Sequence, residues 1–167
     1  MAFLGIKRKI AFICVNHLFV GVKQFKRKRK LLNWIGYDIG EGSKIVGPLV
    51  CTADLKIGKN CWVGKNFIVN GNGKVTIGDN CDIAPEVIFQ TGGHEIGNSE
   101  RRAGKGVKYE IKVGKGCWIG ARSTVLGGAE IGNGCVVAAC ACVLGKVEEN
   151  TLVGGIPVKT IKYLPGD

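Results

Sequence analysis

Apolar residues recur at every sixth position over most of this chain, and that spacing is its dominant pattern. The repeat runs from residue 39 to residue 69, resumes at 77 after a slip of two residues, and resumes at 113 after a longer interruption. Every position in this series is apolar: Ile39, Ile45, Cys51, Ile57, Val63, Val69, Ile77, Ile83, Phe89, Val113, Ile119, Val125, Ile131, Val137 and Val143. Glycine follows many of these anchors directly, as in Ile57-Gly58 and Ile119-Gly120.

A period of six matches neither an amphipathic helix nor a simple alternating strand. It is typical of a parallel β-helix, in which each hexapeptide supplies one short strand and one corner. Three hexapeptides then close a triangular coil, the anchors point inward, and successive coils stack at the ~4.8 Å spacing of neighbouring strands. Glycine permits the tight corners. We therefore predict an all-β parallel β-helix; a glycine-rich β-sandwich would require the spacing to be accidental.

Composition supports one folded domain whose charge is concentrated at one end. The chain has 167 residues, 46% hydrophobic and 22% charged, which excludes a disordered tail. Its 27 glycines are far above the usual share of ~7%. Residues 1–30 hold nine of the 24 lysines and arginines and no acid, because the first acidic residue is Asp38. The remainder of the chain is nearly neutral, so the high net charge of +11 describes the N-terminal segment.

Residues 1–38 are expected to form a basic arm of one or two short helices. The apolar run from Ile10 to Val22 is too short for a transmembrane helix, which needs roughly 20 residues. A secretory signal fits poorly because the run leads into Lys26-Arg27-Lys28-Arg29-Lys30. One interpretation is attachment of residues 1–30 to an anionic membrane surface. The other is a solvated arm or a helix packed on the main body. Without a recognisable nucleic-acid module, we expect no nucleic-acid partner.

Eight cysteines raise the question of a metal site or of disulfides. Cys61, Cys81, Cys117 and Cys135 each lie four positions after an anchor, where this architecture needs small, partly buried side chains. The chain lacks a Cys-x-x-Cys pair, and a zinc site needs a tetrahedral ligand cluster. We predict structural free thiols and no metal, which suits a reducing cytoplasm.

The interruption after Phe89 is the predicted functional region. It is polar, rich in glycine and charge, and too long for a corner, so residues 91–111 are expected to leave the β-helix as a loop. His94 lies at the base of this loop, whereas the second histidine, His17, lies in the basic arm. An imidazole can take a proton from a hydroxyl group at neutral pH. His94 is therefore our candidate general base.

Several segments together resemble the hexapeptide-repeat O-acetyltransferases, which are left-handed β-helices, and in particular the maltose, galactoside and polysaccharide enzymes. The matching segments are residues 74–80, Ile83-Ala84-Pro85, Thr91-Gly92-Gly93-His94, residues 113–121 and residues 154–161. The resemblance covers about residues 39–164. It implies a left-handed coil, an acetyl-CoA co-substrate, and a homotrimer with active sites at the clefts between protomers. Residues 39–158 would form the acyltransferase domain and residues 159–167 a C-terminal tail.

The resemblance also implies roles for individual residues. His94 would be the catalytic base, and backbone N–H groups of the Trp118–Ala121 turn would be candidates to stabilise the oxyanion. The coenzyme would contact small or basic residues and one aromatic: Trp118, Gly120, Ala121, Ala138, Ala139, Lys159 and Lys162. The acceptor would meet polar residues near the loop: Asn72, Glu100, Arg101 and Arg102. Contact with the neighbouring subunit is the alternative role for Glu100, Arg101 and Arg102.

The leading functional hypothesis is a cytoplasmic enzyme that acetylates a sugar or polysaccharide-precursor hydroxyl, peripheral on the inner membrane face if the basic arm binds lipid. A serine O-acetyltransferase uses similar coils, but that family usually carries a large helical N-terminal domain. A carbonic anhydrase of the γ type needs three histidine ligands, and the predicted coils contain only His94. A purely structural β-helix is expected to show flat rows of threonine and no polar loop.

Overall fold

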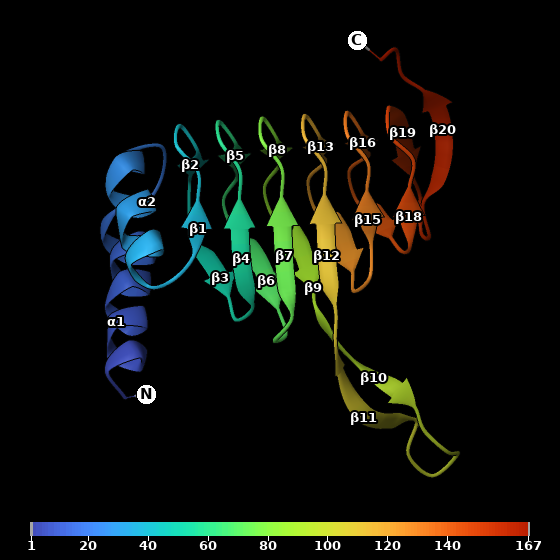
Figure 1. Ribbon diagram of the computed structural model, residues 1–167, viewed down its shortest axis with the longest axis horizontal. Helices are drawn as coiled ribbons and strands as arrows, with labels where there is room; N and C mark the ends of the chain where they lie inside the picture. The colour runs from blue at the N-terminus through green and yellow to red at the C-terminus, as the bar shows by residue number, and fades with distance from the viewer. Residues whose placement is uncertain (1, 167) are drawn as a thin grey trace.

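Three parallel β-sheets run side by side along the molecule, and the chain enters them in turn (Figure 1). The computed structural model describes the backbone of residues 2–166 and the side chains of residues 5–166. Face A contains β1 (Asp38–Ile39), β4 (Asp54–Ile57), β7 (Lys74–Ile77), β12 (Glu110–Val113), β15 (Glu130–Ile131) and β18 (Lys146–Val147). Face B contains β2 (Lys44–Ile45), β5 (Trp62–Val63), β8 (Asp82–Ile83), β13 (Trp118–Ile119), β16 (Val136–Val137), β19 (Thr151–Gly154) and β20 (Lys159–Tyr163). Face C contains β3 (Leu49–Cys51), β6 (Phe67–Asn70), β9 (Ile88–Gln90), β14 (Thr124–Leu126) and β17 (Cys142–Val143).

The predicted parallel β-helix is confirmed, and the hexapeptide anchors form its core. All fifteen anchors are buried, and the most exposed of them, Cys51, keeps only 5% of its surface accessible. Two further anchors, Val147 and Val153, continue the series after a shortened step at the C-terminal end. Because each anchor points into the coil and stacks on its counterpart in the next, the core is one continuous apolar column.

The two-residue slip has a local structural cause. Strands of face A pair with an offset of 18 residues between Asp38 and Lys56, but Lys56 pairs with Thr76 across a larger step. The extra residues lie in the corner Gly71-Asn72-Gly73, where Gly71 has a φ of +95° that side chains rarely adopt. This enlarged corner pushes Asn72 outward beside the chain that leaves the coil after Thr91.

One corner carries a column of small donor side chains. Four positions after each face A anchor lie Ser43, Cys61, Cys81, Cys117, Cys135 and Thr151, all buried. The Cys81 thiol donates to the Gly114 carbonyl at 3.0 Å and the Cys117 thiol to the Gly132 carbonyl at 3.0 Å, which joins successive coils. The hydrogen bond with Cys117, followed by burial, raises the pKa of Cys81 to about 11. All eight cysteines are free, and the four of this column are buried, as predicted for structural thiols.

The N-terminal segment is a helical cap on the first coil (Figure 1). It consists of α1 (Ala2–Ile13), a π-helical turn η1 (Cys14–Leu18) and α2 (Phe25–Trp34). Three of its side chains satisfy the backbone groups that the first coil would otherwise leave unpaired. The Asn16 amide bonds both the N–H and the carbonyl of Leu49, and the Asn33 amide does the same at Ile39. On face B, the buried Lys28 ammonium donates to the carbonyls of Ile45 and Val46.

These contacts explain why the first coil does not expose open strand edges. Unpaired edges invite pairing with other chains, and natural β-proteins cover them. Lys28 also donates to the Gly21 carbonyl at 2.6 Å, so its three ammonium protons all have partners. Burial lowers the pKa of Lys28, which shows that the charged form is held there at some cost. Of the two interpretations of this segment, the structure shows helices packed on the main body.

Replacing Asn33 with alanine is expected to destabilise the protein by about 1–3 kcal/mol, because both backbone groups of Ile39 lose their partner. The measurement is the free energy of unfolding in denaturant. Asn72→Ala is the matched control, since Asn72 is exposed and lies outside the cap. Equal stability of the two variants would contradict the capping role of Asn33.

Candidate active site

The segment between β9 and β12 is an antiparallel hairpin and not an irregular loop. Its strands are β10 (Gly92–Ile96) and β11 (Ala103–Lys108), and it projects away from the coils (Figure 1). Gly92 pairs with Lys108 and His94 with Gly106. The register shifts between His94 and Ile96, which marks a bulge next to the histidine. Such bulges redirect a side chain relative to a regular strand.

Thr91 and Tyr109 hold the base of this hairpin on the coil. The buried Thr91 hydroxyl donates to the Asn70 carbonyl at 2.7 Å and accepts from the Gly73 N–H at 3.1 Å. The Tyr109 N–H donates to the Thr91 carbonyl at 2.8 Å. The Tyr109 ring lies against Gly93, where an added Cβ would come within 3.0 Å of the ring carbon Cε2. The residue next to His94 is thus fixed by an aromatic side chain.

The hairpin also determines the tautomer of His94. The Nδ1 atom lies 2.9 Å from the Gly104 carbonyl oxygen on the opposite strand. A carbonyl oxygen only accepts hydrogen bonds, so Nδ1 must carry the proton and donate it. In the neutral imidazole, Nε2 is then the acceptor. Gly104 is the orienting partner that the sequence does not identify, and it leaves Nε2 ready to receive a proton.

A shallow pocket of about 360 Å³ surrounds His94. Its lining is mostly polar or glycine: Asn72, Gln90, Gly92, Gly93, His94, Gly106, Val107 and Lys108. The structure therefore brings the predicted acceptor residue Asn72 together with His94. Glu100, Arg101 and Arg102 do not line this pocket, because they lie in the tip of the hairpin, where Arg102 donates to the Gly97 carbonyl at 3.2 Å.

The predicted coenzyme residues gather on face B. A groove of about 430 Å³ is lined by Trp118, Gly120, Ala121, Ala138 and Ala139, together with apolar neighbours. Small side chains here allow a flexible ligand to approach the backbone. Gly120 also has a structural role, because an added Cβ would lie 2.5 Å from the Ala139 nitrogen of the next coil. Trp118 is 58% exposed and borders a second hollow of about 340 Å³ that extends toward Trp62.

Lys159 and Lys162 lie beside this groove, although neither lines it. Both are on β20, which folds back antiparallel onto β19. Lys162 pairs with Leu152, which is a groove residue, and Lys159 pairs with Gly154. Both lysines are exposed. Their position at the C-terminal end of the groove leaves both ammonium groups accessible to an anionic ligand.

The expectation for oxyanion donors needs correction. The Trp118 N–H donates to the Cys135 carbonyl and the Gly120 N–H to the Val137 carbonyl, both as part of coil stacking. These two groups are therefore engaged. Within the described residues of the Trp118–Ala121 turn, the Ala121 N–H remains as the candidate, since only its carbonyl is bonded, to the N–H of Cys140.

The candidate site consists of two separate parts on one chain, the His94 pocket and the Trp118 groove. Within the described part of the chain, no residue lines both the His94 pocket and the Trp118 groove. His94 leaves the coil after face C, whereas the groove lies on face B. The His94 pocket and the Trp118 groove are thus separate features of one chain.

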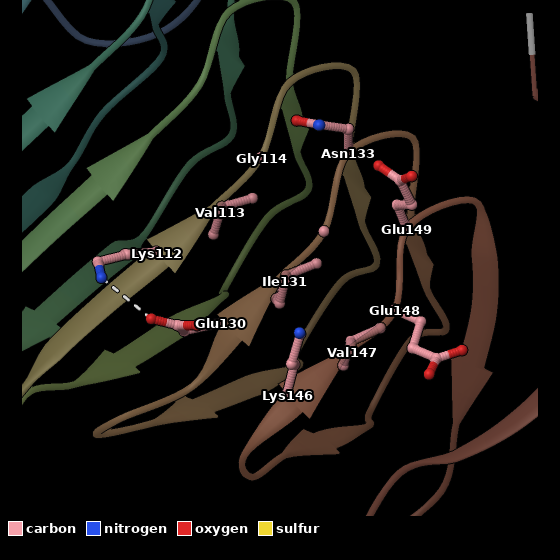
Figure 2. Close-up of a pocket in the computed structure, with 11 residues that line it drawn as sticks. Lys112, Val113, Gly114, Glu130, Ile131, Asn133, Lys146, Val147, Glu148 and Glu149 are labelled. Carbon is pink, nitrogen blue, oxygen red and sulfur yellow. Dashed lines mark hydrogen bonds and ion pairs between the residues drawn. The ribbon is translucent and has the colours of Figure 1, made fainter.

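A larger hollow of about 600 Å³ lies over face A and contains none of the predicted site residues (Figure 2). Figure 2 shows the Lys112 ammonium paired with the Glu130 carboxylate on the next strand, with Lys146 one strand further on. Glu148 and Glu149 stand at the adjoining corner. The Lys112–Glu130 ion pair is exposed, and exposed ion pairs contribute little to stability. Face A is thus a solvated, alternately charged surface.

Over residues 2–166, no group of three or more histidine, cysteine, aspartate or glutamate side chains is arranged to hold a metal ion. Among the helices that the structure describes, none is long and apolar enough to cross a membrane.

Sequence reasoning missed Gln90, Val107 and Lys108 in the pocket, Tyr109 at its base, and Gly104 as the partner of His94. The signal was available in part. Glycine recurs at every second position in Gly104 and Gly106, but a hairpin without a short Asn-Gly turn is weakly marked in sequence.

Comparisons with known proteins agree with this geometry. The family model "Bacterial transferase hexapeptide (six repeats)" matches residues 110–145, and "Hexapeptide repeat of succinyl-transferase" matches residues 54–84. The galactoside O-acetyltransferase of Escherichia coli (strain K12) is 26% identical over 143 residues, which cover 84% of this chain and 70% of that protein. The protein C18B11.09c of Schizosaccharomyces pombe (strain 972 / ATCC 24843), whose name also places it among acetyltransferases, is 30% identical over 149 residues, or 85% of this chain and 70% of its own.

Solved structures show the same architecture. A galactoside acetyltransferase in complex with coenzyme A superposes with a TM-score of 0.83 and 25% identity, covering 97% of this chain and 82% of that one. A hexapeptide-repeat acetyltransferase from Vibrio cholerae O1 biovar eltor, complexed with acetyl coenzyme A, superposes with a TM-score of 0.83 and 25% identity. The superposition covers 99% of this chain and 89% of that one. Such superpositions require the same coil hand. The repeat, the fold and the relatives agree, and the chain belongs to the hexapeptide-repeat acetyltransferase family.

Proposed function

We propose that the protein is an acetyl-CoA-dependent O-acetyltransferase that acts on a sugar or polysaccharide-precursor hydroxyl. The observation that carries this proposal is the hydrogen bond from His94 Nδ1 to the Gly104 carbonyl, which leaves Nε2 as an acceptor in a polar pocket. Family membership supports acetyl-CoA as the co-substrate, because structures of similar proteins contain coenzyme A or acetyl coenzyme A.

In this proposal the acetyl group moves directly from sulfur to oxygen. Nε2 of His94 takes the proton of the acceptor hydroxyl while that oxygen attacks the thioester carbonyl. A C–O bond forms, the C–S bond breaks, and the proton passes from His94 to the departing CoA thiolate. The Ala121 N–H is the candidate donor to the transient oxyanion, which needs prearranged hydrogen bonds. Asn72 and Gln90 are in position to bind hydroxyl groups of a sugar.

The acetyl-CoA site is proposed along the face B groove. Ala138 and Ala139 leave room for the pantetheine arm, and Trp118 forms one wall. Lys159 and Lys162 supply positive charge for the nucleotide phosphates. Glu100, Arg101 and Arg102 at the hairpin tip are proposed to contact either the acceptor or the neighbouring protomer.

We propose a homotrimer in which a neighbouring copy joins the two half-sites, since no described residue lines both of them on one chain. The outward residues of face C support this arrangement. Val50 is 48% exposed, and Ile68 and Ile88 on adjacent strands are partly exposed, so an apolar row runs along this face. Face A carries alternating charges instead. Face C is thus the better contact surface, with the hairpin of one protomer reaching the groove of the next.

We also place the reaction in the cytoplasm. All eight cysteines are free thiols, a state that a reducing compartment preserves. Cys140 is exposed and would be open to oxidation elsewhere.

The test of the proposed activity is release of CoA thiol from acetyl-CoA in the presence of a panel of acceptors. The panel contains mono- and disaccharides, polysaccharide fragments and serine. We expect release with a saccharide and not with serine. Release with serine alone would contradict the sugar assignment, and no release with any acceptor would contradict the enzyme assignment.

A further inference from the structure

The helical cap has a second apolar surface that the fold does not use. Ala11 of α1 and Val15 of the adjoining turn η1 are fully buried against the body of the protein. Ile6, Ile10 and Ile13 are 59%, 48% and 53% exposed. Residues separated by three or four positions share one side of a helix, so these isoleucines form a single outer stripe. We call Ile6, Ile10 and Ile13 the outer stripe.

A helix that is apolar on opposite sides is normally buried on both. Here only the inner side is covered. The exposed apolar character continues beyond the helix, at Leu18, Val20 and Val22, which are 67%, 50% and 64% exposed. Figure 1 shows that the two helices form the end of the solenoid, so no later coil lies beyond them. Within the described residues, the outer stripe is therefore left uncovered.

The charges around the outer stripe indicate the chemistry of that partner. Lys9 lies next to Ile10 in sequence and is exposed. Lys23, Lys26, Arg27 and Lys30 of the same cap are exposed as well. The cap itself contains no acidic residue, since the first acid of the chain is Asp38, and one carboxylate of the first coil, Glu41, shares a hollow with Lys26 and Arg27. A surface that is apolar and strongly cationic matches a partner that is apolar and anionic.

We propose that the helical cap docks on an anionic lipid surface, with the outer stripe inserted at the level of the headgroups. A second copy of this cap fits poorly, because each copy would bring the same uncompensated positive charge to the contact. Helix α1 has 12 residues, too few to cross a bilayer but enough to lie in its interface. Binding then combines burial of the isoleucines with attraction of the lysines and arginines to anionic headgroups.

The contacts of Lys28 and Arg8 separate the docking charges from the structural ones. Lys28 is buried and bonded to backbone carbonyls, and Arg8 donates to the Tyr37 hydroxyl at 2.9 Å. These two cations stabilise the cap itself. The exposed cations are free to be changed without removing those contacts, so the proposal can be tested in a folded protein.

The experiment is co-sedimentation of the full-length protein with vesicles. One set is phosphatidylcholine alone, and the other contains roughly one-third phosphatidylglycerol to supply negative charge. We expect binding to the anionic vesicles, weakened by added salt because the attraction is screened. Replacing the outer stripe by serine (I6S, I10S and I13S together) should lower the partition coefficient at least about tenfold, since apolar burial is lost.

Two matched controls isolate the cap. Three exposed apolar residues at the opposite end are changed to serine in the same way: L144S, I156S and I161S. The charge variant of the cap combines K26Q, R27Q and K30Q. Its control changes three exposed lysines of the coils in the same way: K59Q, K65Q and K115Q. Only the cap variants should lose vesicle binding, and all should keep the thermal midpoint of the parent.

Three outcomes would overturn the proposal. The first is absence of binding to anionic vesicles. The second is equal binding by the outer-stripe variant and its control. The third is a change in oligomeric state, measured by light scattering, when the outer stripe is replaced, which would assign the stripe to another copy of the chain. Because the readout is vesicle binding, these outcomes are independent of the acceptor assay.

Discussion

Replacing His94 with alanine should lower kcat by at least ~100-fold, the usual contribution of a general base. The structure gives the reason. Nδ1 is engaged with the Gly104 carbonyl, so the imidazole presents a fixed Nε2 acceptor to the pocket that contains Asn72. Alanine removes that acceptor and leaves the acceptor hydroxyl without a base. The KM for acetyl-CoA should change little, because the proposed coenzyme groove contains no part of the hairpin.

The second histidine of the chain is the control. His17 is exposed in the helical cap, away from both halves of the site, so His17→Ala should keep the parent kcat. The thermal midpoint of both variants is measured alongside. A His94→Ala variant with full activity would contradict the base assignment, whatever its stability.

Blocking the face B groove should produce the complementary defect. Ala139 is exposed and lines the groove, so Ala139→Trp places a large ring where the pantetheine arm is proposed to lie. We expect the KM for acetyl-CoA to rise at least tenfold, which corresponds to about 1.4 kcal/mol of lost binding. The KM for the acceptor should stay within a factor of about two, because Ala139 does not line the pocket in which the acceptor is proposed to bind.

Lys59→Trp is the matched control for this substitution. Lys59 occupies the equivalent place two residues after an anchor, is exposed, and lies outside the groove. It should leave the KM for acetyl-CoA unchanged. An unchanged KM in Ala139→Trp would contradict the assignment of the groove to the coenzyme.

The hexapeptide spacing was sufficient to predict the coil because every anchor has the same environment. Each of the fifteen positions needs an apolar side chain of moderate size, so the requirement repeats in the sequence and becomes visible. The cysteine column was readable for the same reason, since Cys61, Cys81 and Cys117 recur at one register position. Coil handedness does not follow from the spacing and came from the resemblance.

The helical cap was only partly predictable. Its helices followed from composition, but the pairing of Asn16 with Leu49, Lys28 with Ile45 and Asn33 with Ile39 occurs once each. A contact that is made only once does not produce a repeating pattern in the sequence. The need for a cap is general, because the first coil must cover its edges, but the residues that cover them depend on tertiary packing.

In the candidate site, His94 was identified from sequence because a break in the repeat marks it, whereas Asn72 came from the family resemblance. Gly104 was not identified, because its contribution is a backbone carbonyl, which any residue provides. The tip residues Arg101 and Arg102 were expected to contact either the acceptor or the neighbouring subunit, and neither of them lines the His94 pocket. Position within a hairpin depends on its register, and charge carries no information about register.

The most direct test of the central claim mixes the His94→Ala variant with the Ala139→Trp variant. Each site is proposed to combine His94 of one protomer with the groove of another. Trimers assembled from equal amounts of His94→Ala and Ala139→Trp chains, refolded together, should regain about a quarter of the parent kcat/KM at low acetyl-CoA, because random assembly joins an intact His94 to an intact groove at that frequency. Activity no higher than the average of the two separate variants would contradict a site shared between protomers.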